Sequence, residues 1–345
     1  MTGRTSLAPA RRGGGRRRRT LRAGALAIAL AAALSACAAA APGVAQPGAE
    51  ASTSPAAPLT FSNCGFPVEI AAAPERVVAV KSTSIEMMLA LGLRDRITAV
   101  AFPDGPYADA WSPADPPPVL SDRVPAQEAV LAQGPDLVYA GWESNFTADG
   151  AGDRTTLASL GIATLVSPSA CREAAMRPDP LTWSDLWAEI ELVGDVFAVR
   201  DRADALVDDD RARLAAVTPD DRGLSALWYS SGSDVPYVGA GIGAPQLIMD
   251  AVGLRNIAAD VDDSWASLSW EAVVDADPDV IVLVDSAWGS TDKKIAQLEG
   301  NPATAALRAV REHRYLVVPF AAGEAGVRTV EAVETLSAQL AELPR

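Results

Sequence analysis

The chain has 345 residues, of which 49% are hydrophobic and 21% charged, a composition that excludes an intrinsically disordered protein and predicts about two globular domains. Three cysteines exclude a disulfide-dense scaffold, and a single histidine, His313, argues against multi-histidine metal sites and histidine-based catalysis. Residues 1–37 hold eight of the 29 basic residues and none of the 44 acidic ones, so the rest of the chain has a net charge of −23 and is a poor partner for nucleic acid.

The N-terminal segment has the pattern of an export signal. Arginines between Arg11 and Arg19 precede an apolar run of 14 residues, 23–36, which is too short to cross a hydrocarbon core of about 30 Å. The run ends in Leu34-Ser35-Ala36-Cys37, which resembles the lipobox of bacterial lipoproteins. We therefore expect a signal peptide over 1–37 and a lipid on Cys37, the alternative being an ordinary signal with an incidental cysteine. Because Arg18-Arg19 also matches a twin-arginine signal loosely, the export route stays open.

Residues 38–58 are rich in Ala, Pro, Gly and Ser, which predicts a flexible tether ahead of a folded body that begins at residue 59. No later segment has about 20 consecutive apolar residues, so we expect the body to lie at the outer face of the cell membrane, held by the lipid. Outside the cytosol, Cys64 and Cys171 are able to form one disulfide. Two buried, reduced thiols are the alternative.

Short β-branched runs alternate with helical patterns along the folded body. Thr83 and Glu86 have the spacing of a capping box, which predicts a helix N-terminus there. A helical connector is predicted over 182–218, between an N-terminal lobe over 59–181 and a C-terminal lobe over 219–345. The alternation predicts an α/β fold with mostly parallel sheets. Its main strands are expected at 76–80, 97–100, 137–140, 163–166, 224–229, 281–284 and 315–318.

One segment occurs twice in the chain. The stretch from Glu128 to Pro135-Asp136 matches the stretch from Glu271 to Pro278-Asp279, at an offset of 143 residues. Each copy has a carboxylate in the first turn of an expected helix, followed by a Pro-Asp stop and an apolar strand. Because open α/β sheets bind ligands at strand ends, two similar lobes predict a ligand cleft between them.

With these segments, the sequence resembles the periplasmic-binding proteins that deliver iron-siderophore complexes, haem and corrinoids to ABC importers. The resemblance also rests on Pro74-Glu75-Arg76-Val77-Val78, Trp228-Tyr229 and Asn256-Ile257-Ala258. It implies two Rossmann-like lobes bridged by a long helix, a non-enzymatic binding function, and ABC permease and ATPase subunits as partners of a monomer. It further implies that Glu128 and Glu271, one in each lobe, dock onto arginines of the permease.

The class of ligand stays open. The segments 139–145, 237–245 and 323–328 are similar to an actinobacterial branch proposed to import a deazaflavin coenzyme precursor, so this ligand stands beside a ferric siderophore and a corrinoid. Two other functions are alternatives. An exported α/β hydrolase would need a G-x-S-x-G motif, which is absent, and a receptor for free Zn²⁺ or Mn²⁺ would need several histidines. We expect no cofactor and no direct metal ligands.

Aromatic residues near the predicted strand ends are the first candidates for ligand contact, because their faces are able to stack on a flat ligand. Local packing in the core is the alternative for each of them. The candidates are Trp142, Trp228, Tyr229, Tyr237 and Trp288.

Basic residues in this acidic chain predict an anionic ligand. Lys81, one of three lysines, opens the expected helix after the first strand together with Ser82, at a location that favours anions. Arg172 and Arg328 lie in loops, and Glu143 adjoins the first candidate tryptophan, so these three residues are further candidates for ligand contact. Ordinary surface charge is the alternative for the basic residues.

Overall fold

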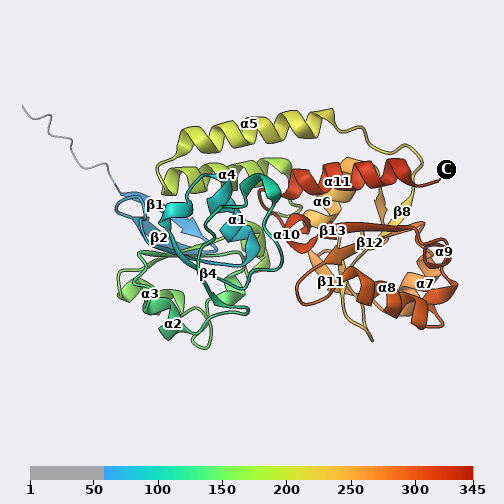
Figure 1. The fold of residues 1–345 in the computed structure, drawn as a ribbon, viewed down its shortest axis with the longest axis horizontal. Coiled ribbons are helices and arrows are strands. Elements are labelled where there is room, and N and C mark those ends of the chain that lie inside the picture. The colour runs from blue at the N-terminus through green and yellow to red at the C-terminus, as the bar shows by residue number, and fades with distance from the viewer. Residues whose placement is uncertain (1–57, 345) are drawn as a thin grey trace, which may run out of the picture. The chain divides into compact units, whose positions relative to one another are not determined.

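A computed structural model describes residues 58–344 and shows two large β-sheets with helices packed on them, together with a small two-stranded sheet (Figure 1). The predicted α/β class and two-lobed architecture are confirmed. We call the sheet of β3–β7 and its helices the N-terminal lobe, and the sheet of β8–β13 and its helices the C-terminal lobe. Cys37, the signal peptide and nearly all of the expected tether lie outside the described residues. In the described part of the chain, no helix combines the length and apolar character needed to cross a membrane.

The N-terminal lobe contains a five-stranded parallel sheet with the order β5-β4-β3-β6-β7. Its central strands are apolar and buried throughout, because α1 and the connector helices cover one face while α2 and α3 cover the other. The chain runs from β3 outward to one edge and then returns to β6, so the sheet has a topological switch point between β3 and β6. The elements are β3 (Val77–Val80), α1 (Ser82–Ala90), β4 (Ile97–Ala101), β5 (Val119–Ser121), α2 (Gln127–Leu131), β6 (Leu137–Ala140), α3 (Arg154–Ser159) and β7 (Ala163–Val166).

The C-terminal lobe contains a six-stranded sheet with the order β11-β9-β8-β12-β13, in which β10 also pairs with β8. Strands β8, β10, β12 and β13 are parallel, whereas β9 and β11 are antiparallel additions at one edge. Helices α6 and α11 cover one face, and α7, α8 and α9 cover the other. The elements are β8 (Ser225–Ser231), β9 (Tyr237–Gly239), α6 (Ala244–Val252), β10 (Arg255–Asn256), β11 (Trp265–Ser267), α7 (Trp270–Ala276), β12 (Val280–Asp285), α8 (Thr291–Gly300), α9 (Arg308–Arg311), β13 (Tyr315–Pro319), α10 (Phe320–Gly323) and α11 (Thr329–Glu342).

A helical hairpin joins the two lobes (Figure 1). Its first helix begins against the C-terminal core at Leu186 and reaches the N-terminal core at Val193. The second helix packs on the N-terminal core through Ala203 and returns to the C-terminal core at Leu214. Both helices therefore cross from one lobe to the other. They are α4 (Trp183–Val196) and α5 (Arg200–Ala216).

An N-terminal β-hairpin, which the sequence patterns did not predict, packs against the outer strand β7. It consists of β1 (Leu59–Asn63) and β2 (Phe66–Ile70). Cys64 in its turn forms a disulfide with Cys171, with 5.2 Å between the two Cα atoms, so the predicted pairing is confirmed. The Asn63 side chain donates a hydrogen bond to the Val166 carbonyl at 2.9 Å. The hairpin is thus fixed to the lobe by one covalent bond and by hydrogen bonds.

The predicted capping box at the start of α1 is wrong. The Thr83 hydroxyl is buried without a hydrogen-bond partner among the described residues, and the Glu86 carboxylate faces Arg328 instead. The helix begins at Ser82, whose backbone N–H donates to the Asp104 carboxylate at 3.2 Å. A residue after β4 therefore satisfies the helix N-terminus, and local spacing carries no sign of such a partner.

Candidate functional site

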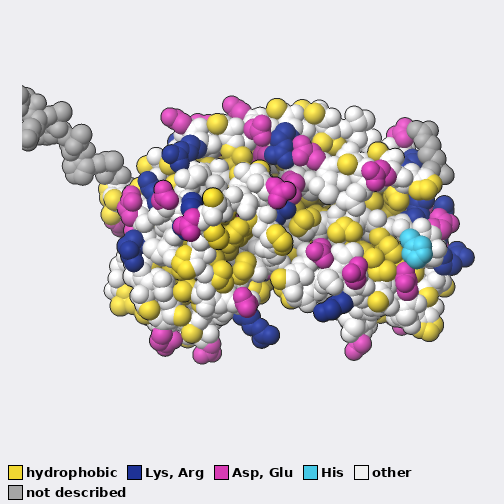
Figure 2. Space-filling model, in the orientation of Figure 1, with side chains coloured by type: hydrophobic (Ala, Val, Ile, Leu, Met, Phe, Trp, Pro, Cys, Tyr) yellow, Lys and Arg dark blue, Asp and Glu magenta, His cyan; other side chains and the backbone are white. Residues whose placement is uncertain are grey.

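The carboxyl ends of the parallel strands in both sheets meet at a cleft between the lobes, where open α/β sheets bind ligands. The cleft holds two adjoining cavities, of about 490 Å³ and about 1000 Å³. We call the first the Tyr237 cavity and the second the Lys81 cavity, after one residue in the lining of each. Trp142 of the N-terminal lobe and Trp288 of the C-terminal lobe line both cavities. Figure 2 shows a hollow at the lower edge between the lobes, with Lys and Arg side chains on either side.

Trp142 follows β6 and connects the two lobes. Its indole Nε1 donates a hydrogen bond to Glu324 Oε2 at 3.0 Å, and its ring meets the Phe320 ring edge-on at a centroid distance of 6.0 Å. Lys81 Nζ lies 3.9 Å from the centroid of the Trp142 ring. These contacts fix the ring as a wall of both cavities.

Lys81 follows β3 and is only 1% exposed, although it borders the cavity named after it. Its ammonium group forms an ion pair with Asp104 and lies 4.0 Å from the centroid of the Phe102 ring. Burial lowers the pKa of Lys81, against the opposing effect of Asp104. The charge of Lys81 is therefore largely neutralised within the protein, while Arg123 adds an exposed cation to the same cavity.

Two aromatic groups of the C-terminal lobe face the Tyr237 cavity. Tyr237 and Trp265 stack at a centroid distance of 6.0 Å and an interplanar angle of 13°, and Tyr237 is 41% exposed. Trp288, at 44% exposed, packs edge-on against Phe320 with centroids 5.3 Å apart. Lys294 Nζ donates to the Val284 carbonyl at 2.7 Å and to Gly289, which holds the loop of Trp288 in place. The cavity thus offers flat faces on both sides.

Arg172 and Arg177 bring positive charge to the Tyr237 cavity. The Arg172 guanidinium is exposed, whereas Arg177 pairs with Asp263 at 3.1 Å. Glu143 does not line either cavity: it accepts a hydrogen bond from the Arg172 backbone N–H at 2.7 Å and pairs with Arg154 at 3.5 Å. Its predicted contact with the ligand is therefore replaced by a role in holding the Arg172 loop.

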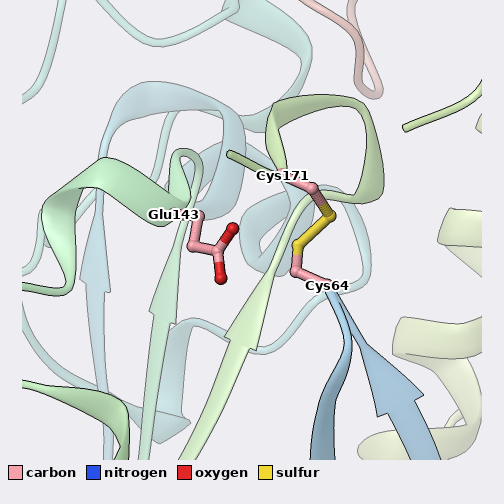
Figure 3. A group of neighbouring side chains, drawn as sticks. All are labelled: Cys64, Glu143 and Cys171. Carbon is pink, nitrogen blue, oxygen red and sulfur yellow. A yellow bond between two sulfur atoms is a disulfide. The ribbon is translucent and has the colours of Figure 1, made fainter. Parts of the chain in front are cut away.

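Glu143 also lies beside the disulfide, in a cluster with Cys64 and Cys171 (Figure 3). Cysteine binds metal ions as a thiolate, and in this structure the two sulfur atoms are bonded to each other. The cluster is therefore a structural link and not a metal centre.

Trp228 and Tyr229 lie in the core and do not line the cleft, contrary to the prediction. Both are in β8, the strand between β9 and β12, and helices cover the two faces of the sheet at this strand. Their side chains are 0% and 1% exposed. The Tyr229 hydroxyl donates to the Gly232 carbonyl at 2.7 Å. A residue near a strand end therefore lines the cleft only when no helix covers its side chain.

Ser82 and Arg328 are also buried, and their polar groups are bonded within the protein. The Ser82 hydroxyl accepts a hydrogen bond from the Asp104 backbone N–H at 2.8 Å. Arg328 pairs with Glu86 of the N-terminal lobe at 3.2 Å and with Glu331 at 2.6 Å, and it lines a separate hollow. The structure therefore places neither residue in the lining of the two cavities.

Comparison with known proteins agrees with this geometry. The profile described as "Periplasmic binding protein" matches residues 77–322 of the chain. The chain belongs to the periplasmic binding protein family. Its relatives are extracytoplasmic substrate-binding components of ABC importers, which work with permease and ATPase subunits, and not enzymes.

Individual relatives of this periplasmic binding protein cover most of the chain. An uncharacterised ABC transporter substrate-binding lipoprotein, YvrC of Bacillus subtilis, is 26% identical over 78% of the chain and 81% of that protein. A cobalamin-binding protein of Halobacterium salinarum is 31% identical over 65% of the chain and 60% of that protein. The structure of an ABC-type Fe³⁺-hydroxamate transport protein from Saccharomonospora viridis is 28% identical, covers 82% of the chain and 99% of that structure, and superposes with a TM-score of 0.71.

The repeated segment has the same structural role in both lobes of this binding protein. The Asp136 carboxylate accepts a hydrogen bond from the Arg76 backbone N–H at 3.1 Å, just before β3. The Asp279 carboxylate accepts one from the Ser225 backbone N–H at 2.9 Å, at the start of β8. In each lobe, the Pro-Asp stop therefore ties the strand that it precedes to the neighbouring strand.

Glu128 and Glu271 occupy equivalent exposed positions in the first turns of α2 and α7. Ser269 caps α7 by accepting the Ala272 N–H at 3.1 Å. Hydrogen bonds from its own backbone and from Ser269 lower the pKa of Glu271. Each lobe thus presents an exposed glutamate side chain to solvent.

Proposed function

We propose that this protein captures an anionic organic ligand or metal chelate with a flat conjugated part and delivers it to an ABC permease. The observation that carries this proposal is the lining of the cleft. It combines aromatic faces from both lobes with cationic side chains in an otherwise acidic chain, an arrangement that favours a flat anion. The residues are Arg123, Trp142, Arg172, Arg177, Tyr237, Trp265 and Trp288.

The names of two relatives support the proposal that any metal reaches this protein already bound in an organic chelate. They are named for Fe³⁺-hydroxamate transport and for cobalamin binding, and both of these ligands are metal chelates. A deazaflavin precursor would use the same aromatic faces. Burial raises the pKa of Tyr237, which disfavours a phenolate ligand for a bare metal ion. We therefore propose a ferric siderophore, a corrinoid or a deazaflavin precursor in preference to a free ion.

Quenching of tryptophan fluorescence tests the ligand class. Purified protein is titrated with a ferric hydroxamate, a ferric catecholate, cyanocobalamin, an 8-hydroxy-5-deazaflavin and ZnCl₂. One of the organic classes should bind, and Trp142→Ala and Arg172→Gln should each weaken that binding about tenfold or more, whereas Arg311→Gln on the distant α9 should not. Tight binding of Zn²⁺ alone, or full affinity in both cleft variants, would contradict the proposal.

We also propose that residues 1–37 direct export, that Cys37 carries a lipid anchor and that residues 38–58 tether the body to the outer face of the cell membrane. The lipobox pattern and the naming of a relative as a lipoprotein support the anchor. We propose a monomer, because one chain supplies both walls of the cleft.

Cys37→Ala should release the protein from membranes. Cell fractionation and immunoblotting of the variant should find it in the soluble extracytoplasmic fraction, whereas Ser35→Ala, which keeps the cysteine, should stay in the membrane fraction. Persistent membrane association of Cys37→Ala would count against the anchor.

We propose that Glu128 and Glu271 dock onto the permease. Their matched positions in the two lobes and their exposure to solvent support this role. Both project from helices on the sheet faces and not into the cleft, so docking does not compete with ligand binding.

A further inference from the structure

Glu324 is a carboxylate at the floor of the Tyr237 cavity that the sequence patterns did not single out. It lies between α10 and α11, is 8% exposed, and contributes to the lining of the cavity. Its Oε2 accepts the hydrogen bond from Trp142 described above. None of the ion pairs among residues 58–344 includes Glu324. A buried carboxylate thus faces the cavity without a cation in contact.

The charged groups around Glu324 are already matched with one another. Lys81 lies behind the Trp142 ring and pairs with Asp104, so one cation stands between two carboxylates. From the other elements around the cavity, Arg177 pairs with Asp263, and Tyr237 contributes a neutral phenol. On the same segment as Glu324, Arg328 is held by Glu86 and Glu331. Arg172 also lines the cavity, but its guanidinium is exposed to solvent and forms no ion pair with Glu324. Within residues 58–344, the buried surroundings therefore supply no further positive charge to balance an ionised Glu324.

We propose that Glu324 determines specificity for anionic ligands by holding a proton when the ligand is bound, so that ligand capture is coupled to proton uptake from solvent. This inference rests on the proposed anionic ligand. The proton bonds to the carboxylate oxygen that is free of Trp142, and the resulting acid has one O–H to donate to the ligand. Trp142 continues to donate to the other oxygen, so no contact between the lobes is lost.

The chemistry of the site agrees with this role. Burial raises the pKa of Glu324 to about 7, although the Trp142 hydrogen bond and Lys81 act in the opposite direction. An anion placed next to the carboxylate raises that pKa further, because like charges disfavour the ionised form. Above pH 7 the site must take up a proton in order to bind, so the affinity for an anion falls with pH, by up to about tenfold per unit.

A pH titration of the ligand-free protein tests whether Glu324 changes its protonation state near neutral pH. Tryptophan fluorescence should change near pH 7, because ionisation of Glu324 alters the environment of the Trp142 indole. The change should vanish in Glu324→Gln, which preserves the acceptor for Trp142. It should persist in Glu189→Gln, the matched control. Burial also raises the pKa of the Glu189 carboxyl to about 7, but this carboxyl bonds to Tyr139 and Ser167, neither of which lines a cavity of the cleft. A wild-type protein without this transition, or a transition that survives in Glu324→Gln, overturns the proposal.

Calorimetry then tests the coupling. Haemin, a ferric catecholate and an 8-hydroxy-5-deazaflavin serve as anionic probes, each titrated at pH 7.5 in two buffers of different ionisation enthalpy. When a probe binds, the wild type and Glu189→Gln should each take up as much as about one proton from the buffer. Glu324→Gln should take up close to none. Binding without proton uptake overturns the inference and leaves the proposed function standing. Failure of every probe and of neutral cyanocobalamin to bind counts against the proposed function, and the ligand-free titration still decides the role of Glu324.

Discussion

Lys81 shows how a single residue sets the geometry of the cleft. Its backbone has φ 82° and ψ 148°, a region that costs side-chain-bearing residues about 1–3 kcal/mol. Gly141 lies close to this turn, since a Cβ atom there would be 2.1 Å from Thr83 Oγ1 and 3.0 Å from Lys81 Cβ. The strained conformation directs the ammonium group beneath the Trp142 ring. The ends of β3 and β6 are therefore packed so closely that the position of Trp142 depends on Lys81.

Replacing Lys81 by Met should destabilise the fold strongly. The variant leaves the Asp104 carboxylate buried without its cation, and breaking a buried ion pair in this way costs about 3–5 kcal/mol. Chemical denaturation should show this loss in the free energy of unfolding. The double variant Lys81→Met/Asp104→Asn should recover most of it, because the neutral amide still accepts from the Ser82 N–H. Equal stability of the wild type and the single variant would mean that the Asp104 charge is solvated.

At the scale of elements, the repeated segment puts Glu128 and Glu271 at equivalent positions, in the first turns of α2 and α7. Glu128→Ala with Glu271→Ala should leave ligand affinity within about twofold while transport in reconstituted vesicles falls by at least tenfold, since permease cations left without partners cost about 2–5 kcal/mol. Glu312→Ala, at an exposed site after α9, is the control and should transport normally. Undiminished transport by the double variant would exclude docking through these residues.

Elements with a regular local pattern were predictable from the sequence. The seven main strands expected from the sequence and the helix pair of the connector lie within a few residues of their predicted places, because apolar periodicity reports burial directly. The short strands β5, β10 and β11 were not predicted. The β1–β2 hairpin was missed, since its fixation depends on Cys171 and on Arg154, far along the chain.

The lining of the cleft was predicted in part. Trp142, Arg172, Tyr237 and Trp288 line it, whereas Glu324 and Arg177 come from loops whose direction is set by contacts between lobes.

At the scale of the whole molecule, buried carboxylates make stability depend on pH. Burial raises the pKa of Glu86, Glu189 and Glu324 to about 7, whereas the unfolded chain has a value close to 4.5. Between these values the folded state holds protons that the unfolded state releases, so the free energy of unfolding falls as pH rises from about 4.5 to 7.

The midpoint of thermal unfolding should therefore be higher at pH 5.5 than at pH 8. Differential scanning calorimetry across this range checks the direction. Glu189→Gln should reduce the pH dependence, because this side chain then no longer titrates. A midpoint that rises with pH would show that these carboxylates are ionised in the folded state at low pH.

Because the hairpin of α4 and α5 carries the chain back and forth between the lobes, the lobes are interlocked and not simply linked in series. The exposed loop around Pro219 follows the last crossing, and the halves of the chain on either side of it still share the Arg213–Glu334, Glu86–Arg328 and Trp142–Glu324 contacts. A protein cut by a protease at this loop should therefore elute from size-exclusion chromatography as a single particle, and its two fragments should separate only in denaturant.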